Sequence, residues 1–327
     1  MSMCAAEAEE KSLLVTGTSH PALAKEVADF LEIELSQVDL FKFPDKEIAL
    51  QVMENVRGRD VFVLQTIALE PNDYLMELLI LVDALKRASA KSINAVIPYF
   101  GYSRQDRKDR PRVPITAKLV ANMLVTAGVD RVLTMELHAD QIQGFFDIPV
   151  DNLYARPLLA EALKEMLDLD NCVCVAPDAG SVKLVRNYAA HLGVEECAVL
   201  DKQRLSAEQV EVVTVIGDVK GKDVLLADDM CSTAGTLVSA AKACREKGAK
   251  NIFVAITHGL FVGDAVDKIE NSPIELLVTS NTIPYTDRLK GSSKIKHVSV
   301  ASLFGKAINC INLKKSISSL YEIKCSL

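Results

Sequence analysis

Two adjacent aspartates followed by small and hydroxyl-bearing residues are the clearest chemical feature of the chain. Residues 223–227 fit a buried strand that ends in Asp228 and Asp229, and a helix pattern begins near Thr233. Backbone N–H groups at a helix start can cradle a phosphate, and glycine lets the backbone approach it closely. A carboxylate pair repels phosphate and suits sugar hydroxyls. We therefore predict a sugar-phosphate site made of Asp228, Asp229, Ser232, Thr233, Ala234, Gly235 and Thr236.

The alternative for this run is an ordinary strand end followed by a capping serine or threonine. A cap needs only one side-chain oxygen. This run instead has two neighbouring acids, and it adds a glycine beside a threonine at Gly235-Thr236. The binding interpretation is therefore favoured over the capping interpretation.

A strongly charged run lies at residues 102–110, directly after an apolar strand pattern. It reads Tyr-Ser-Arg-Gln-Asp-Arg-Lys-Asp-Arg and holds four basic residues within seven positions. Arginine forks match phosphate oxygens, so such a run could neutralise a triphosphate. On charge pattern alone, a solvated surface loop is the simpler interpretation. No Gly-x-x-x-x-Gly-Lys-Ser/Thr run occurs in the sequence, so a P-loop kinase is not indicated.

Three other features have simple structural explanations when each is taken alone. A lone histidine such as His138 is more often structural than a ligand. Lys202 and Arg204 fit two exposed cations after a strand, and Phe43 fits a core residue. Only their order along the chain, together with the two runs above, gives them a chemical meaning.

Length and composition indicate a globular chain with two domains. The chain has 327 residues, of which 49% are hydrophobic and 25% charged. The net charge of −7 argues against a nucleic-acid surface as the main role. No apolar run is long enough to span a bilayer, and residues 1–11 lack the features of a signal peptide. We expect a cytoplasmic protein that binds neither nucleic acid nor membrane.

Short apolar runs alternate with amphipathic helical patterns along the whole chain. This alternation predicts parallel sheets with helices on both faces. Asn72 is the expected N-cap of the second helix. The expected strands are 13–15, 61–65, 93–98, 131–135, 172–176, 198–200, 223–227 and 252–257, and the expected helices are 21–31, 72–88, 115–126, 156–167, 181–191 and 233–246.

The pattern restarts after about residue 152, which suggests two related α/β domains. Ala90-Lys91-Ser92-Ile93 and Ala249-Lys250-Asn251-Ile252 both lie between a helix and a strand. The match is short, so it hints at duplication without proving it. The predicted organisation is an N-terminal domain at 11–152, a C-terminal domain at 153–312 and a tail at 313–327.

Taken in order, these runs resemble the ribose-phosphate pyrophosphokinase family, also called phosphoribosyl pyrophosphate synthetases. Residues 228–236 are similar to the ribose-5-phosphate loop of that family and of type I phosphoribosyltransferases, and residues 104–109 are similar to the family's ATP loop. The resemblance extends from Gly17 to about Ser318. It implies two type I phosphoribosyltransferase-like domains, each a parallel sheet with helices on both faces, and an active site between them.

The resemblance also assigns roles to individual residues. It implies that Mg²⁺ is the cofactor, and that a catalytic Lys-x-Arg pair lies on a mobile loop. The ATP contacts come partly from a turn of a neighbouring subunit. The implied catalytic residues are Lys202 and Arg204, the ATP-binding residues are Arg104, Gln105 and Asp109 with Phe43, Asp45 and Glu47 from the neighbour, and the metal ligands are His138, Asp178 and Glu136.

The implied activity is that of a ribose-phosphate diphosphokinase, a transferase of nucleotide biosynthesis. It moves the β,γ-diphosphoryl group of ATP to the 1-hydroxyl of ribose 5-phosphate, giving phosphoribosyl pyrophosphate and AMP. The family resemblance further implies a homo-oligomer, expected to be a hexamer. Inorganic phosphate is expected to activate such an enzyme and ADP to inhibit it.

Three departures from the family pattern keep two alternatives open. Glu136 and Ser232 stand where the family usually has aspartate. The segment Gly180-Ser181-Val182-Lys183-Leu184 lacks the usual second glycine and the usual arginine at its last position. A catalytically weak, synthetase-associated regulatory subunit is therefore the second hypothesis. A phosphoribosyltransferase that consumes the diphosphate sugar is the third, although it would have no use for an ATP loop.

Overall fold

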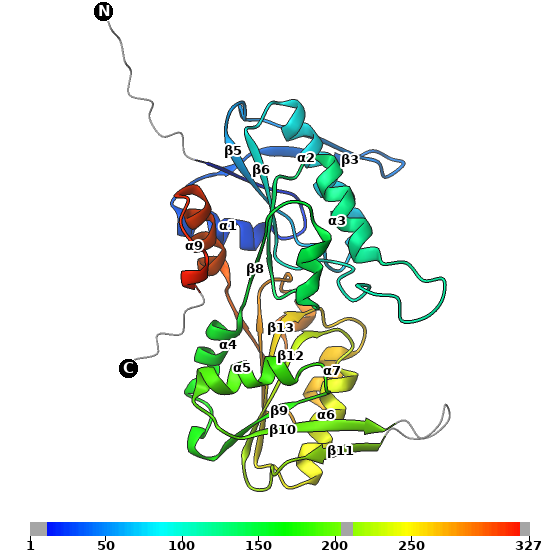
Figure 1. The fold of residues 1–327 in the computed structure, drawn as a ribbon, viewed down its shortest axis with the longest axis vertical. Coiled ribbons are helices and arrows are strands. Elements are labelled where there is room, and N and C mark those ends of the chain that lie inside the picture. Colours follow the sequence, from blue (N-terminus) through cyan, green and yellow to red (C-terminus); the bar gives the residue numbers. More distant parts are fainter. Residues whose placement is uncertain (1–11, 204–211, 321–327) are drawn as a thin grey trace, which may run out of the picture. The chain divides into compact units, whose positions relative to one another are not determined.

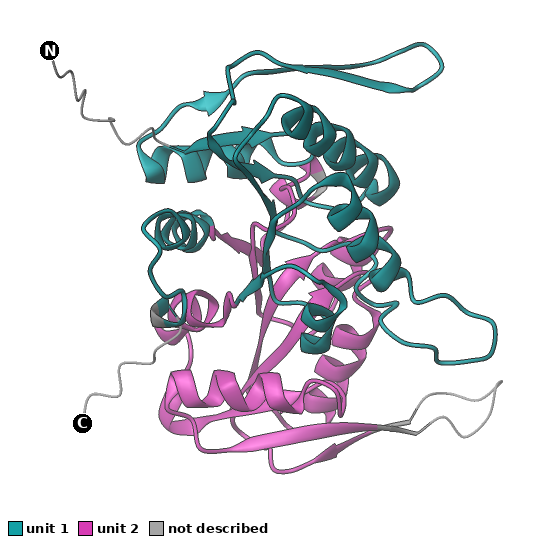
Figure 2. Cartoon of the chain, turned by 45° about the horizontal axis from the view of Figure 1, so that its top comes forward, with its two compact units in different colours: residues 1–153, 301–321 teal, residues 154–300, 322–327 magenta. Residues whose placement is uncertain are grey.

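The structure is a computed structural model that describes residues 12–203 and 212–320 and forms two compact units (Figure 2). Unit 1 consists of residues 12–153 and 301–320, and unit 2 of residues 154–300. The first change of unit thus falls one residue after the boundary expected from the sequence.

The last long helix returns to unit 1. Helix α9 (Ala301–Asn312) packs against α1 (Pro21–Leu31), and Asn312 Nδ2 donates to Ser12 Oγ at 2.8 Å. A Cβ atom on Gly305 would lie 2.2 Å from the Phe30 ring, so glycine is what allows this close contact. The sequence placed α9 in the second domain, because nothing in its local pattern reveals which core it joins.

Unit 1 is built on a six-stranded parallel sheet in the order β2-β1-β5-β6-β7-β8. Helices α1 and α9 pack together, and so do α2 (Pro71–Arg87) and α3 (Thr116–Ala127). Chain connections through α1 and α2 run to opposite sides of the β1–β5 pair, so right-handed crossovers place the two helix pairs on opposite faces (Figure 1). The strands are β1 (Leu13–Thr16), β2 (Leu35–Ser36), β5 (Asp60–Leu64), β6 (Ser92–Ile97), β7 (Arg131–Met135) and β8 (Val150–Leu153).

Unit 2 repeats this plan with seven strands in the order β11-β10-β9-β12-β13-β14-β15. All neighbours are parallel except β10 and β11, which are antiparallel. Helix α4 packs on α5, and α6 packs on α7 (Figure 1). The elements are α4 (Arg156–Lys164), β9 (Cys172–Ala176), α5 (Val182–Leu192), β10 (Cys197–Gln203), β11 (Val212–Ile216), β12 (Asp223–Cys231), α6 (Gly235–Glu246), β13 (Asn251–Gly259), α7 (Ala265–Glu270), β14 (Leu276–Ser280), α8 (Asp287–Lys290) and β15 (Ile295–Val298).

The expected fold class of two helix-covered, mainly parallel sheets is confirmed. The bounds of α1, β7 and β9 match the expected ranges to the residue. The expected cap is wrong, because α2 begins at Pro71 with Glu70 as its N-cap, and Asn72 lies inside the first turn. Proline is favoured at this first position, since its missing N–H would have no helical partner there.

A two-stranded antiparallel hairpin was not predicted. Strands β3 (Val38–Lys42) and β4 (Ile48–Val52) pair with each other and form a separate two-stranded sheet. Most of their residues are exposed or half-buried, so neither strand has the apolar pattern that marks a core strand. The hairpin carries the turn that the sequence assigned to adenine recognition.

The same backbone hydrogen bond recurs at corresponding points of the two units. Lys91 N donates to Arg59 O, and Lys250 N donates to Lys222 O, each at 2.8 Å. In each unit, the lysine just before one strand (β6 or β13) donates its N–H to the residue just before the neighbouring strand (β5 or β12). This recurrence supports the duplication that the two Ala-Lys units suggested.

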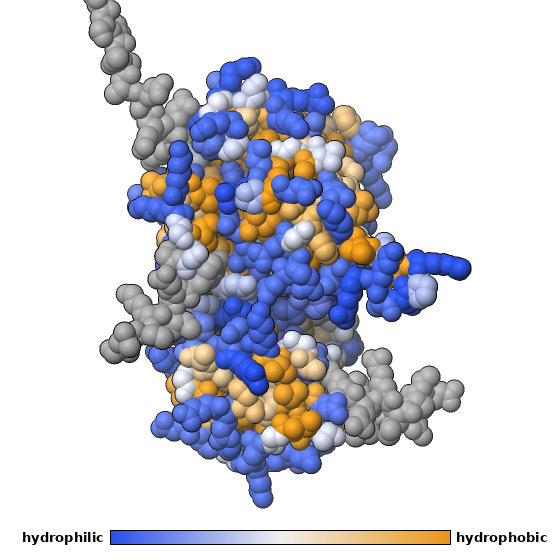
Figure 3. Space-filling model, in the orientation of Figure 1, coloured by the Kyte–Doolittle hydropathy of each residue, from blue (hydrophilic) through white to orange (hydrophobic). Residues whose placement is uncertain are grey.

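The surface seen in Figure 3 is mostly polar, with smaller apolar areas between the charged side chains. The apolar side chains that remain exposed include Phe41 and Phe43 of the hairpin, at 49% and 47%. Within residues 12–203 and 212–320, no helix combines the length and the hydropathy needed to cross a bilayer.

Candidate functional site

The ends of β9 and β12 meet at the point where the strand order of unit 2 reverses. The chain leaves β9 through α5 toward β10 on one side, and leaves β12 through α6 toward β13 on the other. In open α/β sheets, ligands bind outside the carboxyl ends of strands at such a point. Asp178 follows β9, and Asp228 lies near the end of β12. The topology therefore brings two predicted site carboxylates to one edge of the sheet.

A serine links these two carboxylates, although the sequence did not identify it as a site residue. Ser181 Oγ lies 2.9 Å from Asp228 Oδ1 and 3.1 Å from Asp178 Oδ1. The Ser181 side chain is buried, with 7% of the residue exposed. A hydroxyl carries one hydrogen and can donate to only one of the two carboxylates at a time. The only signal of Ser181 in the sequence was that it replaces a glycine usual in the family.

Burial raises the pKa of the Asp228 carboxyl to about 7, and the negative charges of Asp229 and Asp178 act in the same direction. The hydrogen bonds from Ser181 and from the Asp229 N–H oppose this rise without cancelling it. The carboxyl therefore takes up or releases its proton near neutral pH. A cation brought to this edge by a ligand would favour the ionised form.

The raised pKa of Asp228 predicts a pH-dependent stability. The folded unit holds a proton that the unfolded chain releases near its ordinary pKa of 3.8. The stabilisation is complete below that value and is lost as the pH rises through about 7. After allowance for partial exposure, the loss should be about 2 kcal/mol.

Urea unfolding at several pH values, without divalent cations, measures this effect in the wild type and in Asp228→Asn. The free energy of unfolding of the wild type should fall relative to that of the variant between about pH 5 and about pH 8. This range brackets the pKa of Asp228 in the folded protein. A constant difference between the two proteins across this range would contradict the prediction.

Strand β12 continues beyond the point where the sequence ended it. Met230 pairs with His258 and Cys231 with Gly259, so Asp228 and Asp229 lie within the strand rather than after it. The expectation that the strand ends before the two acids is therefore wrong. The longer pairing holds the acids on rigid backbone instead of on a loop.

The loop after β12 is fixed by the segment that follows β13. Leu260 N and Phe261 N donate to the Cys231 carbonyl at 2.9 and 3.2 Å, and Val262 N donates to the Ser232 carbonyl at 2.9 Å. Ala234 is the N-cap of α6 and has a φ of 60°, a left-handed conformation that is uncommon outside glycine. Ser232 is half-buried, whereas Thr233, Gly235 and Thr236 are exposed at the start of the helix. All seven predicted sugar-phosphate residues therefore lie at one end of β12.

At the corresponding edge of unit 1, neutral side chains stand in the positions of the two aspartates, and a carboxylate lies between them. Strand β5 of unit 1 corresponds to β12 of unit 2, and β1 corresponds to β9. When the paired residues of these strands are aligned, Gln65 corresponds to Asp228 and Thr18 to Asp178. The carboxylate of Glu77, from α2, lies between these neutral residues. Its Oε1 accepts from Gln65 Nε2 at 2.8 Å and from Thr18 N at 2.5 Å, and its Oε2 accepts from Thr18 Oγ1 at 2.8 Å. Glu77 is only 2% exposed, so this edge is filled by the protein's own anion.

The residues predicted to contact ATP lie on an exposed loop of unit 1 between β6 and α3. Arg104, Gln105 and Asp109 are all exposed. The loop is held at its start, where Gln105 N donates to the Tyr102 carbonyl at 2.9 Å and Thr116 Oγ1 donates to Gln105 Oε1 at 2.5 Å. Tyr102 has a φ of 64°, which turns the chain sharply into the charged run.

The predicted metal segment follows β7. Glu136 is buried, at 4% exposure, with a φ of 43°, and its N–H donates to the Leu153 carbonyl at 2.8 Å. His138, two residues later, is exposed. Within the described parts of the chain, no three His, Cys, Asp or Glu side chains form a cluster that could hold a metal ion. The roles of Glu136, His138 and Asp178 in metal binding stay predictions.

Of the two predicted catalytic residues, Lys202 lies in the described part of the chain. Lys202 lies on β10, where its backbone pairs with that of Val213 on β11, so the expectation of a loop is wrong for this residue. The antiparallel partner strand was not predicted, and it extends β10 further than its apolar core suggested. Arg204 lies outside the described residues.

The turn assigned to adenine recognition is the tip of the β3–β4 hairpin. Phe43, Asp45 and Glu47 are all exposed, and Phe43 packs edge-on against Phe41 with ring centroids 5.3 Å apart. Phe43 N donates to the Glu47 carbonyl at 2.8 Å, which closes the turn. The simple interpretation of Phe43 as a core residue is therefore wrong.

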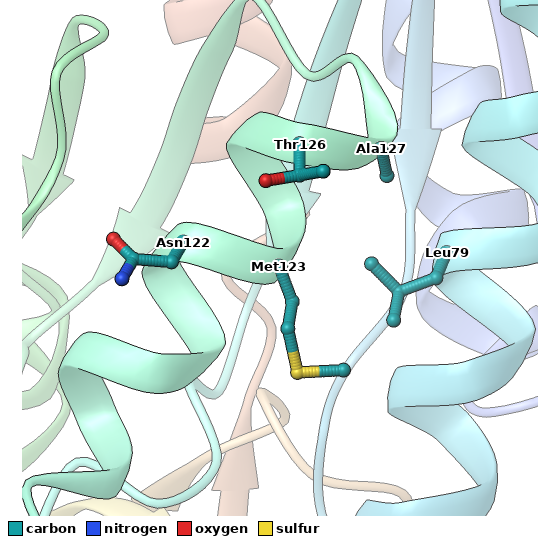
Figure 4. Close-up of a pocket in the computed structure, with 5 residues that line it drawn as sticks. All are labelled: Leu79, Asn122, Met123, Thr126 and Ala127. Carbon is teal, nitrogen blue, oxygen red and sulfur yellow. The ribbon is translucent and has the colours of Figure 1, made fainter.

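A surface hollow between α2 and α3 contains none of the predicted site residues. Its lining is mostly apolar and comes from one residue of α2 and four of α3 (Figure 4). The lining residues are Leu79, Asn122, Met123, Thr126 and Ala127. Without a convergent set of charged groups, this hollow lacks the chemistry of the edge formed by β9 and β12.

Comparison with known proteins identifies the family of the chain. The family model of the N-terminal domain of ribose phosphate pyrophosphokinase matches residues 12–128, and the model of the phosphoribosyl synthetase-associated domain matches residues 194–322. Ribose-phosphate pyrophosphokinase of Wolinella succinogenes is 51% identical over 308 residues, covering 94% of this chain and 98% of that protein. The enzyme of the same name from Chromobacterium violaceum is 49% identical over 316 residues, 96% of both chains.

A solved structure extends the agreement to the fold. The crystal structure of phosphoribosylpyrophosphate synthetase from Mycobacterium smegmatis superimposes with a TM-score of 0.88 at 40% identity, covering 93% of this chain and 100% of that one. Identity at this level over nearly the whole length, with the same fold, establishes common descent. The chain therefore belongs to the ribose-phosphate pyrophosphokinase family.

Proposed function

We propose that this chain transfers the β,γ-diphosphoryl group of ATP to the 1-hydroxyl of ribose 5-phosphate. A bond forms between the ribose oxygen and the β-phosphorus, the bond from that phosphorus to the α-phosphate oxygen breaks, and the hydroxyl proton is released. The products are phosphoribosyl pyrophosphate and AMP. The observation that carries the proposal is the meeting of Asp178, Ser181 and Asp228 at the ends of β9 and β12. The relatives' shared name supports the same reaction.

The ribose 5-phosphate site is the end of β12 and the start of α6. Asp228 and Asp229 accept hydrogen bonds from the ribose hydroxyls. Thr233, Gly235 and Thr236 are exposed at the start of a 12-residue helix, and with Ala234 they offer N–H groups and hydroxyls to the 5-phosphate. The phosphate and the sugar thus meet groups of opposite character a few residues apart.

ATP binding falls to the exposed charged loop and to a neighbouring subunit. Arg104 supplies a cationic fork for phosphate oxygens, and Gln105 and Asp109 provide polar contacts on the same loop. Phe43, Asp45 and Glu47 of another copy recognise adenine. The exposed aromatic pair at the hairpin supports this role, because such a surface suits contact with a ligand and a second chain. A homo-oligomer, expected to be a hexamer, follows.

The residues at the β9–β12 edge fit a magnesium ion. Mg²⁺ prefers hard oxygen ligands and is usually held by one or two carboxylates together with substrate phosphates. Asp178 offers such a carboxylate, and a nearby cation would favour the ionised form of Asp228, whose pKa is raised to about 7 by burial. Asp178 is the metal ligand that we expect in unit 2, and His138 and Glu136 are the metal ligands that we expect in unit 1. When bound, the ion would neutralise charge on the ATP phosphates.

Lys202 and Arg204 act as the catalytic cations in this proposal. The transferred group carries several negative charges, and such reactions depend on positioning and charge neutralisation more than on covalent chemistry. Cations close to the β-phosphate would stabilise the charge that develops during transfer. The expected setting is the cytoplasm, with inorganic phosphate as activator and ADP as inhibitor.

An AMP-release assay tests this function. The protein is incubated with ATP, ribose 5-phosphate, Mg²⁺ and phosphate, and AMP is measured beside a Lys202→Ala control. We expect AMP to form only when ribose 5-phosphate is present and the rate to fall at least about 100-fold in the variant. No AMP above the control would sink the proposal. A protein that becomes active only when mixed with another synthetase would instead be the regulatory subunit suggested by Glu136, Ser232 and Leu184.

A further inference from the structure

We propose that Ser181 is a positioning residue of the ribose 5-phosphate site, whose hydroxyl fixes the carboxylates of Asp178 and Asp228. The inference deepens the proposed function and rests on it. It assigns a specific task to a residue that differs from the glycine usual in the family.

The Asp178 carboxylate is held through one oxygen. Its Oδ1 accepts from both the backbone N–H and the hydroxyl of Ser181, each at 3.1 Å. No hydrogen bond to its Oδ2 is formed by any residue in the described parts of unit 2. The carboxylate is therefore oriented, and Oδ2 remains able to accept from a ligand or bind a cation.

The Asp228 carboxylate is held in the same manner. Its Oδ1 accepts from Ser181 Oγ at 2.9 Å and from the Asp229 N–H at 3.0 Å. Within residues 154–203 and 212–300, its Oδ2 accepts no hydrogen bond. The Ser181 hydroxyl thus contacts Oδ1 of both acids and can donate to either one, and each acid presents its Oδ2. One hydroxyl lies between two ligand-binding groups, one on β12 and one in the segment after β9.

The helix that begins at Ser181 shows that the hydroxyl is directed at the site. Ser181 is the N-cap of α5, a position where serine normally accepts a hydrogen bond from the backbone two or three residues later. Ser181 makes no such bond. Its φ of −83° and ψ of −1° are helical, and Asp178 Oδ1 accepts from the Ser181 N–H at 3.1 Å, as a capping side chain would. The Ser181 hydroxyl is therefore not used as a cap and lies between the two carboxylates.

Removal of the hydroxyl should loosen both carboxylates without disturbing the helix. Alanine keeps the Cβ atom of Ser181 and removes no cap, so α5 should still form. Asp178 and Asp228 would then lose a shared partner and turn away from each other, because like charges repel. Ribose 5-phosphate would then have to orient Asp228 as it binds, and the cation would have to orient Asp178, which weakens binding of the sugar more than it slows the bound complex.

The experiment compares Ser181→Ala, Ser181→Thr and Ser272→Ala with the wild type. Ser272 is a matched control, since it is also buried in unit 2, at 8% exposure, and its hydroxyl bonds only to nearby backbone. We expect Ser181→Ala to raise KM for ribose 5-phosphate about tenfold, in the range of one hydrogen bond to a charged group. KM for ATP and kcat should change less than about threefold by the same reasoning.

The threonine variant separates positioning from packing. It retains the hydroxyl, so KM for ribose 5-phosphate should stay within about threefold of the wild-type value, because the hydrogen bonds of the hydroxyl orient the carboxylates. Equal losses in the alanine and threonine variants, or an unchanged KM in the alanine variant, would overturn the inference. Circular dichroism and thermal midpoints confirm that each variant is folded.

Direct calorimetric binding of ribose 5-phosphate with Mg²⁺ keeps the two proposals distinguishable. A wild type that binds the sugar but releases no AMP refutes the reaction, and the inference is then judged on the dissociation constants of the same variants. A wild type that does not bind ribose 5-phosphate overturns the inference as well. AMP release with an unaffected Ser181→Ala variant refutes the inference alone.

Discussion

Asp228→Asn should lower kcat/KM for ribose 5-phosphate at least about 100-fold, the largest effect on activity that we expect from a change in unit 2. Asparagine keeps the size of the side chain but removes the negative charge that makes its oxygen a strong acceptor for ribose hydroxyls. It also places a donating NH₂ group beside Ser181 and Asp178. Steady-state kinetics with ribose 5-phosphate as the varied substrate measure the effect.

Asp223→Asn is the matched control for this change. Asp223 is a buried aspartate at the other end of β12, where its carboxylate accepts from the Asp168 N–H and from Asn251 Nδ2. Its loss should reduce stability and leave kcat/KM within about threefold of the wild type, because it lies at the opposite end of the sheet from the site. Equal losses of activity in both variants would show that the Asp228 effect is structural.

Glu77→Ala should reduce the free energy of unfolding of unit 1 by about 3–5 kcal/mol, the largest stability effect that we expect. The change removes a carboxylate that is 2% exposed and is the acceptor for three donors, Thr18 N, Thr18 Oγ1 and Gln65 Nε2. Hydrogen bonds to a buried charged group contribute more than a surface contact, and the loss also leaves a cavity beside the buried Gln65. Thermal unfolding should show a midpoint lower by roughly 10 °C.

Asp83→Ala is the control on the same helix. Asp83 pairs with Arg87 on the exposed face of α2, with an O–N distance of 2.6 Å. Exposed pairs of this kind contribute about 0.3–0.5 kcal/mol, so the midpoint should move by a degree or two. Added acetate or formate should partly restore the thermal midpoint of Glu77→Ala, since a small carboxylate can enter the cavity. If Glu77→Ala is no less stable than Asp83→Ala, the buried carboxylate does not hold unit 1 together.

Regular elements were predictable from the sequence because their signals are local. The apolar stripe of α1 begins at Pro21, and the continuous apolar runs of β7 and β9 mark strands buried on both faces. The C-terminal extension of β12 and the pairing of β10 with β11 were not predictable. Both features depend on which other strand lies alongside and pairs with the backbone, and the residue types within a strand do not identify that partner.

The site was predictable to the extent that it lies in one continuous run. Residues 228–236 could be recognised together, and the structure places them at one strand end. Ser181 could not be recognised, because its significance lies in contacts with Asp178, three residues away, and with Asp228, 47 residues away. Without the resemblance, Phe43 fitted a core residue, since an aromatic residue has the same identity in a core and on a hairpin tip.

The return of α9 to unit 1 has a consequence for how the chain is made. A ribosome releases the polypeptide from its N-terminus, and domains generally fold as their sequence emerges. Unit 2 is complete once residue 300 has emerged, whereas unit 1, which starts first, still lacks the helix that covers α1. The half of the protein synthesised second can therefore finish folding first. Until the last helix arrives, the residues of α1 that pack against α9 lack this cover.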